Sequence, residues 1–377
     1  MSLLKDLYYG TTDINFPKLW RPMLIVSGLL VAASTVSLAA QGLNLSIDFS
    51  GGAVWEVPAE KLTEDQAREI LTGFDKADGS KIQEVTDAKG VRLLRVQASA
   101  AKDIAESQQI TAKFAEKAEV ATEQINVNTV GPSWGKEITK DAGIALLVFF
   151  LIISAYISWQ LEWRMAVAAL TAVAHDVIVT VGVYSLLRFE VTPATVISFL
   201  TILGYSLYDT IVVYDRVQHN STRYDRSGKY TYTAMMRRSL NQVIMRSMNT
   251  TLVALLPAVG ILAIGGVAFG QTVMFDFGLA LFVGLLSGAY SSIAIASPVV
   301  VWLKEREEKY RRVRERARQR GAEDEANWIR PGAQLVKVGA PVGRDLSGDS
   351  AAKAVEAKAQ QYERPHPPRP RKQGKKR

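Results

Sequence analysis

The sequence holds six long apolar stretches, and these restrict the fold more than any other feature. An α-helix rises about 1.5 Å per residue, so roughly 20 apolar residues cross the ~30 Å hydrocarbon core of a bilayer. We therefore predict a polytopic α-helical membrane protein with six transmembrane helices. The stretches are residues 22–41, 142–159, 165–187, 194–214, 247–264 and 275–303.

The first stretch is predicted to be an uncleaved anchor. Its apolar core is longer than that of a cleavable signal peptide, and it begins only after Arg21. The chain of 377 residues then divides into a cytoplasmic N-terminus (1–21), a first transmembrane segment (22–43), an extracytoplasmic domain (44–137), a five-helix transmembrane region (138–303) and a tail (304–377).

Lysine and arginine are distributed unevenly between the connections, which predicts the orientation. Cytoplasmic connections carry an excess of these residues. The connection between the third and fourth stretches has only Arg188, and residues 265–271 carry no charge. Both termini are therefore expected to be cytoplasmic. The cations of the expected cytoplasmic connections are Lys5, Lys18, Arg21, Arg164, Arg216, Arg223, Arg226, Lys229, Arg237 and Arg238.

The polar segment 44–137 is long enough for a small α+β domain. Thr63 and Gln66 have the spacing of a capping box at a helix start. Since the chain has no cysteine, this domain cannot contain a disulfide. We predict helices packed on an antiparallel sheet. The expected strands are residues 45–49, 53–57, 81–86, 91–97 and 125–130, and the expected helices are residues 64–74 and 101–120.

The tail carries the positive charge of the chain. Residues 303–377 contain 21 Lys and Arg against 11 Asp and Glu, a net of +10, while the whole chain is +8. Residues 304–320 are predicted to extend the last helix, and the segment beyond Gly321 is predicted to be disordered. A solvated extension and a surface that attracts anionic lipids are both open interpretations. Nucleic acid is not an expected partner.

Asp209 and Arg246 are ionisable residues in the fourth stretch and at the start of the fifth. Such residues are costly in a bilayer and usually functional. If the fourth stretch runs inward and the fifth returns outward, both residues lie at a similar depth. We expect a proton-coupling pair in which protonation of Asp209 releases Arg246. The alternative is a static buried ion pair that fixes the helix bundle.

His175 and Asp176 lie near the middle of the third stretch. Neighbouring helix positions point roughly 100° apart, so only one of them can share a groove with Asp209. We predict Asp176 as a further proton-coupling residue, and a structural acid is the alternative. His175 has no second ligand at i+4, so no metal site is predicted. Asp276, near the outer end of the sixth stretch, is interpreted as an interfacial or helix-start acid.

Two short motifs connect the extracytoplasmic domain to the membrane. Asp48, Gly51 and Gly52 follow the first stretch, and Gly131 and Pro132 precede the second. Glycine permits tight backbone turns. We predict a structural role for both motifs and expect them to act as joints when the domain moves.

Five strings, taken in order along the chain, resemble the SecF family of the RND superfamily. They are residues 48–52, 130–132, 175–176, 204–216 and 291–298. The resemblance covers residues 15–303 and implies six spans and a SecD partner. It also implies that the acid of the Asp-Thr pair in span four and an arginine early in span five are proton-linked, which correspond to Asp209 and Arg246. Where the family typically has Asn before this acid, this chain has Tyr208.

The resemblance further implies a role in protein export across the bacterial plasma membrane. Members associate with SecD, the SecYEG translocon and, in many bacteria, YajC. They use the proton motive force to help draw preproteins outward after insertion driven by SecA. No cofactor is implied.

Other functions stay open from the residues alone. No phosphate-binding glycine loop, catalytic carboxylate pair or Ser/His/Asp set is present, so an enzyme is not expected. An RND-type exporter of small molecules or lipids is one alternative, although it normally has twelve spans in one chain. A non-transporting scaffold is another. Six spans with one polar domain indicate half of a larger assembly, so we expect either a partner that supplies the rest or a homodimer. The resemblance implies that the partner is SecD-like.

Overall fold

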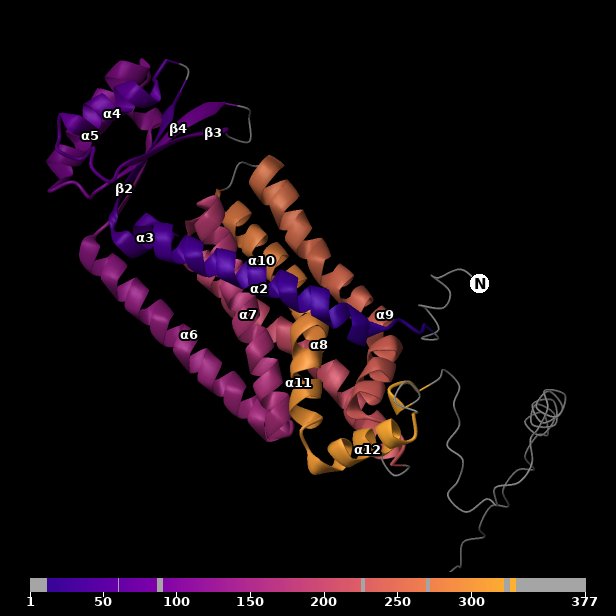
Figure 1. The fold of residues 1–377 in the computed structure, drawn as a ribbon. Helices are drawn as coiled ribbons and strands as arrows, with labels where there is room; N and C mark the ends of the chain where they lie inside the picture. The colour runs from indigo at the N-terminus through magenta and orange to yellow at the C-terminus, as the bar shows by residue number, and fades with distance from the viewer. Residues whose placement is uncertain are drawn as a thin grey trace, which may run out of the picture. The chain divides into compact units, whose positions relative to one another are not determined.

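The computed structural model describes residues 12–59, 61–86, 91–224, 228–268, 272–321 and 326–329. Within them, six helices are long and apolar enough to cross a membrane (Figure 1), as the sequence predicted. The first four are α2 (Phe16–Gln41), α6 (Pro132–Gln160), α7 (Trp163–Leu187) and α8 (Pro193–Tyr224); the fifth is α9 (Tyr232–Gly260) with the π-helix η3 (Ile261–Ala268), and the sixth is α10 (Thr272–Ser291) with the π-helix η4 (Ser292–Ala296) and α11 (Ser297–Lys304).

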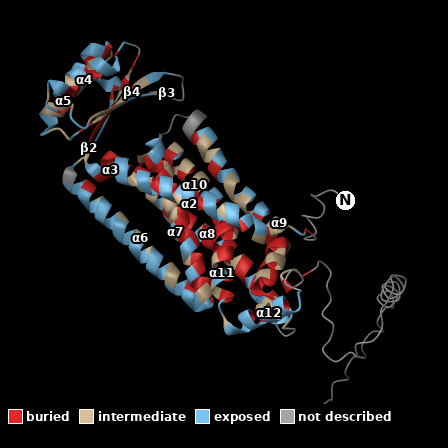
Figure 2. Ribbon diagram, in the orientation of Figure 1, coloured by how far each residue is buried: buried red, intermediate tan, exposed pale blue. Residues whose placement is uncertain are grey.

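The six helices differ strongly in burial, which shows which of them form the centre of the bundle. Of the most apolar 18 residues of each helix, 56% are buried in α7 and in the sixth helix, but only 6% are buried in α6. Figure 2 shows the same contrast, with α6 almost entirely exposed. Small side chains allow the central helices to approach closely. The buried face of α7 is rich in alanine, with Ala166, Ala168, Ala169 and Ala172.

Three glycines mark the closest helix contacts. A Cβ on Gly182 of α7 would lie 2.0 Å from Ser34 Oγ of α2. A Cβ on Gly284 of α10 would lie 2.2 Å from Ile202 of α8, and one on Gly288 would lie 2.9 Å from Ser206 Cβ. Gly284 and Gly288 are four residues apart, so they form one small-residue stripe against which α8 packs.

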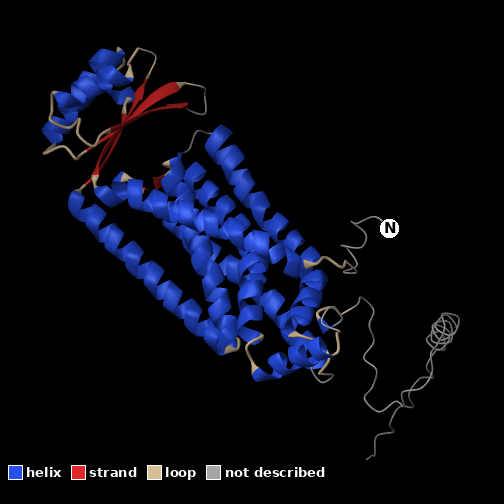
Figure 3. Ribbon diagram, viewed as in Figure 1, coloured by secondary structure: helices blue, strands red, loops and turns tan. Residues whose placement is uncertain are grey.

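A four-stranded antiparallel sheet with two helices forms the polar domain (Figure 3), in agreement with the predicted α+β fold. Trp55 and Phe114 are fully buried in its core, with ring centroids 5.9 Å apart. Thr63 and Gln66 form the predicted capping box. The strands, in sheet order, are β3 (Lys81–Thr86), β4 (Arg92–Ala98), β2 (Gly52–Pro58) and β5 (Asn126–Val130), and the helices are α4 (Glu64–Thr72), α5 (Ile104–Ala118) and the 3₁₀ turn η1 (Thr122–Gln124).

The predicted strand at residues 45–49 is wrong. Strand β1 (Asn44–Leu45) is short and pairs in parallel with β6 (Glu190–Val191), and a one-turn helix, α3 (Ile47–Ser50), follows. Ile47 and Phe49 alternate like strand residues, but both are buried within the helical turn. The alternation of these apolar residues therefore reflects the burial of both side chains and not a β-strand.

The connection between the fourth and fifth apolar stretches is helical for most of its length. Helix α8 continues to Tyr224, and α9 already begins at Tyr232. Buried amide contacts hold the two polar helix ends together, because Asn220 Nδ2 donates to Ser239 Oγ (2.8 Å) and to Gln242 Oε1 (2.9 Å). The apolar pattern ends before the helices do, since this polar pairing continues them.

The start of the tail is helical but does not simply extend the sixth helix. Helix α11 ends at Lys304, and a separate helix, α12 (Glu308–Gln319), follows. The predicted disorder beyond Gly321 is wrong for residues 326–329, because Ala326 and Ile329 are buried and Thr231 N donates to Ala326 O (3.0 Å). The rest of that segment lies outside the described residues.

Candidate proton-coupling site

Asp209 is buried in the bundle, with 4% of the residue exposed. Its Oδ2 atom accepts hydrogen bonds from two hydroxyl groups, those of Ser247 on α9 and Ser292 of η4; the second is 3.0 Å long. Both partners are neutral donors. The structure therefore holds this acid by hydroxyl groups from the two helices that face α8.

Arg246 does not pair with Asp209 in this structure. Its Nη2 donates to the hydroxyl of Tyr208 at 3.4 Å, and none of the ion pairs among the described residues joins Asp209 to Arg246. Tyr208 is 48% exposed and Arg246 is exposed as well.

Helix geometry explains this separation. Tyr208 and Asp209 are neighbours on α8, and Arg246 and Ser247 are neighbours on α9, so each pair points in two directions roughly 100° apart. The inner direction joins Asp209 to Ser247, and the outer direction joins Tyr208 to Arg246. The sequence placed the acid and the cation at a similar depth but could not show which side of the helix each occupies.

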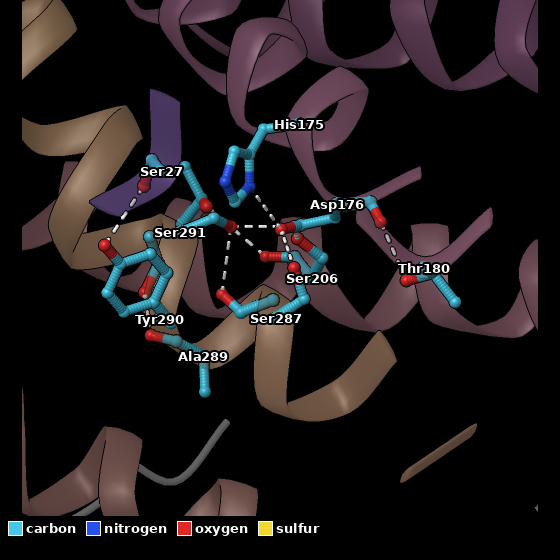
Figure 4. A network of polar contacts seen from close by, with 12 residues as sticks. Ser27, His175, Asp176, Thr180, Ser206, Ser287, Ala289, Tyr290 and Ser291 are labelled. Carbon is cyan, nitrogen blue, oxygen red and sulfur yellow. Dashed lines mark hydrogen bonds and ion pairs between the residues drawn. The ribbon is translucent and has the colours of Figure 1, made fainter. Parts of the chain in front are cut away.

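Asp176 of α7 is fully buried and has more polar partners than Asp209. Three hydroxyl groups donate to its carboxylate: Ser206 to Oδ2 (2.6 Å), Ser291 to Oδ2 (2.7 Å) and Ser287 to Oδ1 (2.7 Å). The adjacent His175 has its Nδ1 at 3.2 Å from Oδ1. Figure 4 shows these side chains converging on the acid from α7, α8 and α10.

The close helix packing positions the serines. Gly288 lets α10 approach Ser206 of α8, so Ser206 can meet Asp176 beside Ser287 and Ser291. The π-helix η4 begins just after Ser291, and the hydroxyl of Ser297 donates to Ser292 O (2.8 Å) across its extra residue. In the sequence, Ser291 and Ser292 were identified only as part of the family-like string at residues 291–298. A serine at i+4 to Ser287 was the available signal for a polar helix face.

The two joint motifs meet in one junction. Gly51 (φ 73°) and Gly52 (φ 140°) have backbone conformations that favour glycine, and a Cβ on Gly52 would lie 2.6 Å from Ala98 O. Asp48 accepts a hydrogen bond from Ser46 Oγ (3.1 Å). Gly131 precedes α6 as its N-cap residue, and Pro132 is the first residue of that helix.

Gly135 brings these motifs together, and it was not predicted from the sequence. A Cβ on this residue of α6 would lie 2.8 Å from both Gly51 N and Phe49 O. Thr139 Oγ1 of the same helix donates to Phe49 O (3.2 Å). The start of α6 thus packs directly on α3.

A polar contact between the sheet and the turn that joins α7 to α8 was also missed. Arg95 of β4 forms an ion pair with Glu190 of β6 (3.2 Å), in which the side chains are 17% and 13% exposed. Lys81 of β3 donates to Asn44 Oδ1. Burial lowers the pKa of Lys81, while Glu190 acts against this shift. These residues lie far apart in the sequence, so no local pattern could reveal the contact.

Two further expectations concern metals and Asp276. Among the described residues, no three His, Cys, Asp or Glu side chains are grouped so that they could hold a metal ion. Asp276 lies in the second turn of α10 and is 7% exposed, so it is more buried than an interfacial acid would be. The hydroxyl of Tyr184 donates to its main-chain oxygen.

With this geometry established, comparison with known proteins decides the family. The family description "Protein export membrane protein SecD/SecF, C-terminal" matches residues 109–306, and "SecD/SecF GG Motif" matches residues 36–61, which include Gly51 and Gly52. The protein translocase subunit SecF of Streptomyces coelicolor is 41% identical over 312 residues, which are 82% of this chain and 82% of that protein. This chain belongs to the SecF family.

Other SecF relatives and solved structures agree with this assignment. The protein translocase subunit SecF of Mycobacterium tuberculosis is 35% identical over 318 residues, 82% of this chain and 71% of that protein. The crystal structure of SecDF, a translocon-associated membrane protein from Thermus thermophilus, has a TM-score of 0.70 at 32% identity over 81% of this chain. This chain spans 40% of the length of that SecDF chain. SecDF in a super-membrane-facing form has a TM-score of 0.57.

Proposed function

We propose that this protein is an auxiliary subunit of the Sec preprotein translocase that, with a SecD-like partner, uses the proton motive force to assist protein export. The names of its SecF relatives and the SecDF likeness support the export role. The observation that carries the proton coupling is Asp209, a buried acid inside an apolar helix bundle whose hydrogen-bond partners among the described residues are hydroxyl groups.

The mechanism rests on two alternative partners for Asp209. In the described state, Ser247 and Ser292 donate to the acid while Arg246 contacts Tyr208. In the other state, Arg246 leaves Tyr208 and pairs with ionised Asp209, and protonation of Asp209 returns the arginine to the tyrosine. Tyr208 thus supplies a resting partner for Arg246. Asp176 is the further candidate for a proton-coupling residue.

The coupled motion reaches the polar domain through its connections to the membrane helices. The junction of residues 48–52 with residues 131–135 and the Arg95–Glu190 contact both join the sheet domain to helices of the bundle. A shift of α8 against α7 and α9 changes the position of β6, and so moves the sheet domain. We assign residues 44–137 to the extracytoplasmic side.

The proposed partners follow from the length relation to SecDF. Since this chain covers 40% of that protein, a SecD-like chain would supply the remaining helices. The SecYEG translocon, YajC and preproteins delivered by SecA complete the proposed assembly in the bacterial plasma membrane, with both termini cytoplasmic. We assign no enzymatic step to the chain.

The segment from Trp302 at the end of the sixth span through α12 is the proposed contact of the tail with anionic lipids. Arg306 lies 3.5 Å over the ring of Trp302, which is 55% exposed at the end of the sixth span. An exposed aromatic ring at a span end is typical of the membrane interface. Cations next to it attract acidic headgroups by about 1 kcal/mol each.

An RND-type exporter of small molecules or lipids is the second candidate, but the relatives are protein translocase subunits, which favours export of proteins. Purification of the tagged chain from its native membrane tests the choice. We expect a SecD-like protein and translocon subunits to copurify, and loss of the SecD-like protein to reduce export and the abundance of this chain. Normal export and normal accumulation without any SecD-like protein would contradict the proposal.

A further inference from the structure

His175 is a buried titratable side chain that the proposed function leaves without a task. Its side chain is 6% exposed. Nδ1 faces Asp176 at 3.2 Å, while Nε2 is buried and has no hydrogen-bond partner among the residues that the structure describes. A polar atom in that position is costly and calls for an explanation. A histidine that served only as packing would avoid this cost if it were replaced by an apolar ring.

The surroundings of Asp176 are those of an ionised carboxylate. Such a group has about four acceptor sites. Ser206, Ser287 and Ser291 donate to three of them, and a proton on His175 Nδ1 fills the fourth. If Asp176 itself carried a proton, the hydroxyl of Ser291 could turn to its second acceptor, Gly288 O at 3.2 Å, and accept that proton. All four groups can donate to the acid together only when it keeps its charge.

An ionised Asp176 needs a counter-charge within the bundle. None of its described hydrogen-bond or ion-pair partners is Lys or Arg. An uncompensated charge in this position would be expensive. A proton at Nε2 turns His175 into an imidazolium in contact with the carboxylate, and the pair then has no net charge.

The groups that face the pair from the neighbouring helices are neutral hydroxyls. Helix α8 contributes Ser206, and α10 contributes Ser287, Ser291 and Tyr290, whose ring centroid lies 6.3 Å from that of His175. On the α2 side, Ser27 Oγ donates to the Tyr290 hydroxyl at 3.0 Å (Figure 4). Asp209 is the other buried acid nearby in this network, since Ser292, which follows Ser291, donates to it.

We propose that His175, and not Asp176, is the member of this pair that binds and releases a proton, with Asp176 as its permanent counter-ion. This rests on the proposed proton-coupled function and assigns one further residue to it. The proton is gained at Nε2 from water and returned from Nε2 to water, so only the N–H bond forms and breaks. Nδ1 keeps its proton and its hydrogen bond to Asp176 throughout.

The chain has three histidines, which allows a direct measurement. In a His219→Gln, His366→Gln background, ¹⁵N spectra of the full chain in complex with its SecD-like partner, in lipid bilayers, report His175 alone. We expect its imidazole to change reversibly between neutral and cationic forms between about pH 5 and pH 9. In the Asp176→Asn variant, the cationic fraction at pH 7 should fall about tenfold. An imidazole that stays neutral over this range, or is unaffected by Asp176→Asn, would overturn the proposal.

An export measurement separates this inference from the proposed function. His175→Gln keeps a hydrogen-bond donor but cannot titrate, and His219→Gln, on the exposed end of α8, is the matched control. We expect His175→Gln to lower proton-driven export about tenfold or more at unchanged complex abundance, while His219→Gln has no effect. If His175→Gln exports normally and Asp209→Asn does not, the inference fails and the proposed function stands. If both export normally, both fail.

Discussion

Ser291 and Ser292 are consecutive in the sequence, yet their hydroxyl groups donate to two different buried acids. Ser291 donates to Asp176 on α7, and Ser292 donates to Asp209 on α8. The π-helix η4 begins at this point, which places two neighbouring residues on the polar side of the helix. A shift of the sixth helix therefore changes the surroundings of both acids together.

Replacing Ser292 tests the importance of this arrangement. Ser292→Ala removes one of two hydroxyl donors from Asp209, and a hydrogen bond of this kind contributes about 0.5–1.5 kcal/mol. We expect proton-driven export to fall by up to about tenfold, as measured by preprotein uptake at fixed complex abundance. Ser221→Ala, which removes a hydroxyl that donates to Gln218 O within α8 (2.8 Å), is the control. Equal export by both variants would show that the donor is dispensable.

Gly182 tests the close crossing of α2 and α7. A Cβ there would lie within 2.0–2.7 Å of three Ser34 atoms, including its Cα, so the helices must separate. We expect Gly182→Ala to destabilise the bundle by about 1–3 kcal/mol. Gly28→Ala on α2, where no atom lies within 4 Å, is the matched control. Thermal unfolding of the purified complex checks this, and a melting temperature equal to that of the control would refute the predicted crossing.

Two arginines of β4 test the contact between the sheet domain and β6. Arg95→Met leaves the largely buried Glu190 without its ion-pair partner, at a cost of about 1–3 kcal/mol. Arg92→Met breaks an exposed pair with Glu84 and should cost less than the loss of Arg95. Hydrogen exchange of residues 190–191 should rise in the first variant only. Equal exchange in both variants would mean that the Arg95 contact does not hold the domain.

The orientation can be tested with single cysteines, because the chain contains none. We expect an impermeant thiol reagent to label Ser80→Cys in intact cells and to label Lys229→Cys only after the membrane is opened. This expectation follows from the excess of Lys and Arg from Arg216 to Arg238. The reverse labelling pattern would invert the topology.

The fold could be predicted from the sequence where it depends on local sequence patterns. Apolar length predicted the six helices, and β3 has its predicted bounds, residues 81–86. Errors arose where tertiary contacts decide the conformation. Ile47 and Phe49 alternate like a strand but pack as a helical turn, and Asn220 continues a polar helix by pairing with Ser239.

For the candidate site, the sequence could predict residue types but not their contacts. Asp176 and Asp209 stand out because acids are rare in apolar stretches. Their donors come from other helices and are serines, which are too common to signal a role. The side of α9 that Arg246 occupies depends on how the helix is rotated about its axis in the bundle. The depth of a residue in the bilayer does not determine this rotation.

Asp209 carries the central claim, and Asp209→Asn tests it most directly because it keeps the shape and removes the titrating group. The measurement is preprotein export into vesicles that contain the full complex, with and without a proton gradient, and with complex abundance determined in parallel. We expect the Asp209→Asn variant to assemble but to gain no acceleration of export from the gradient, and Arg246→Met to behave likewise. Asp215→Asn, at an exposed position of the same helix, should respond like the wild type. If Asp209→Asn accumulates normally and still exports at the wild-type rate in a gradient-dependent way, proton coupling does not depend on Asp209.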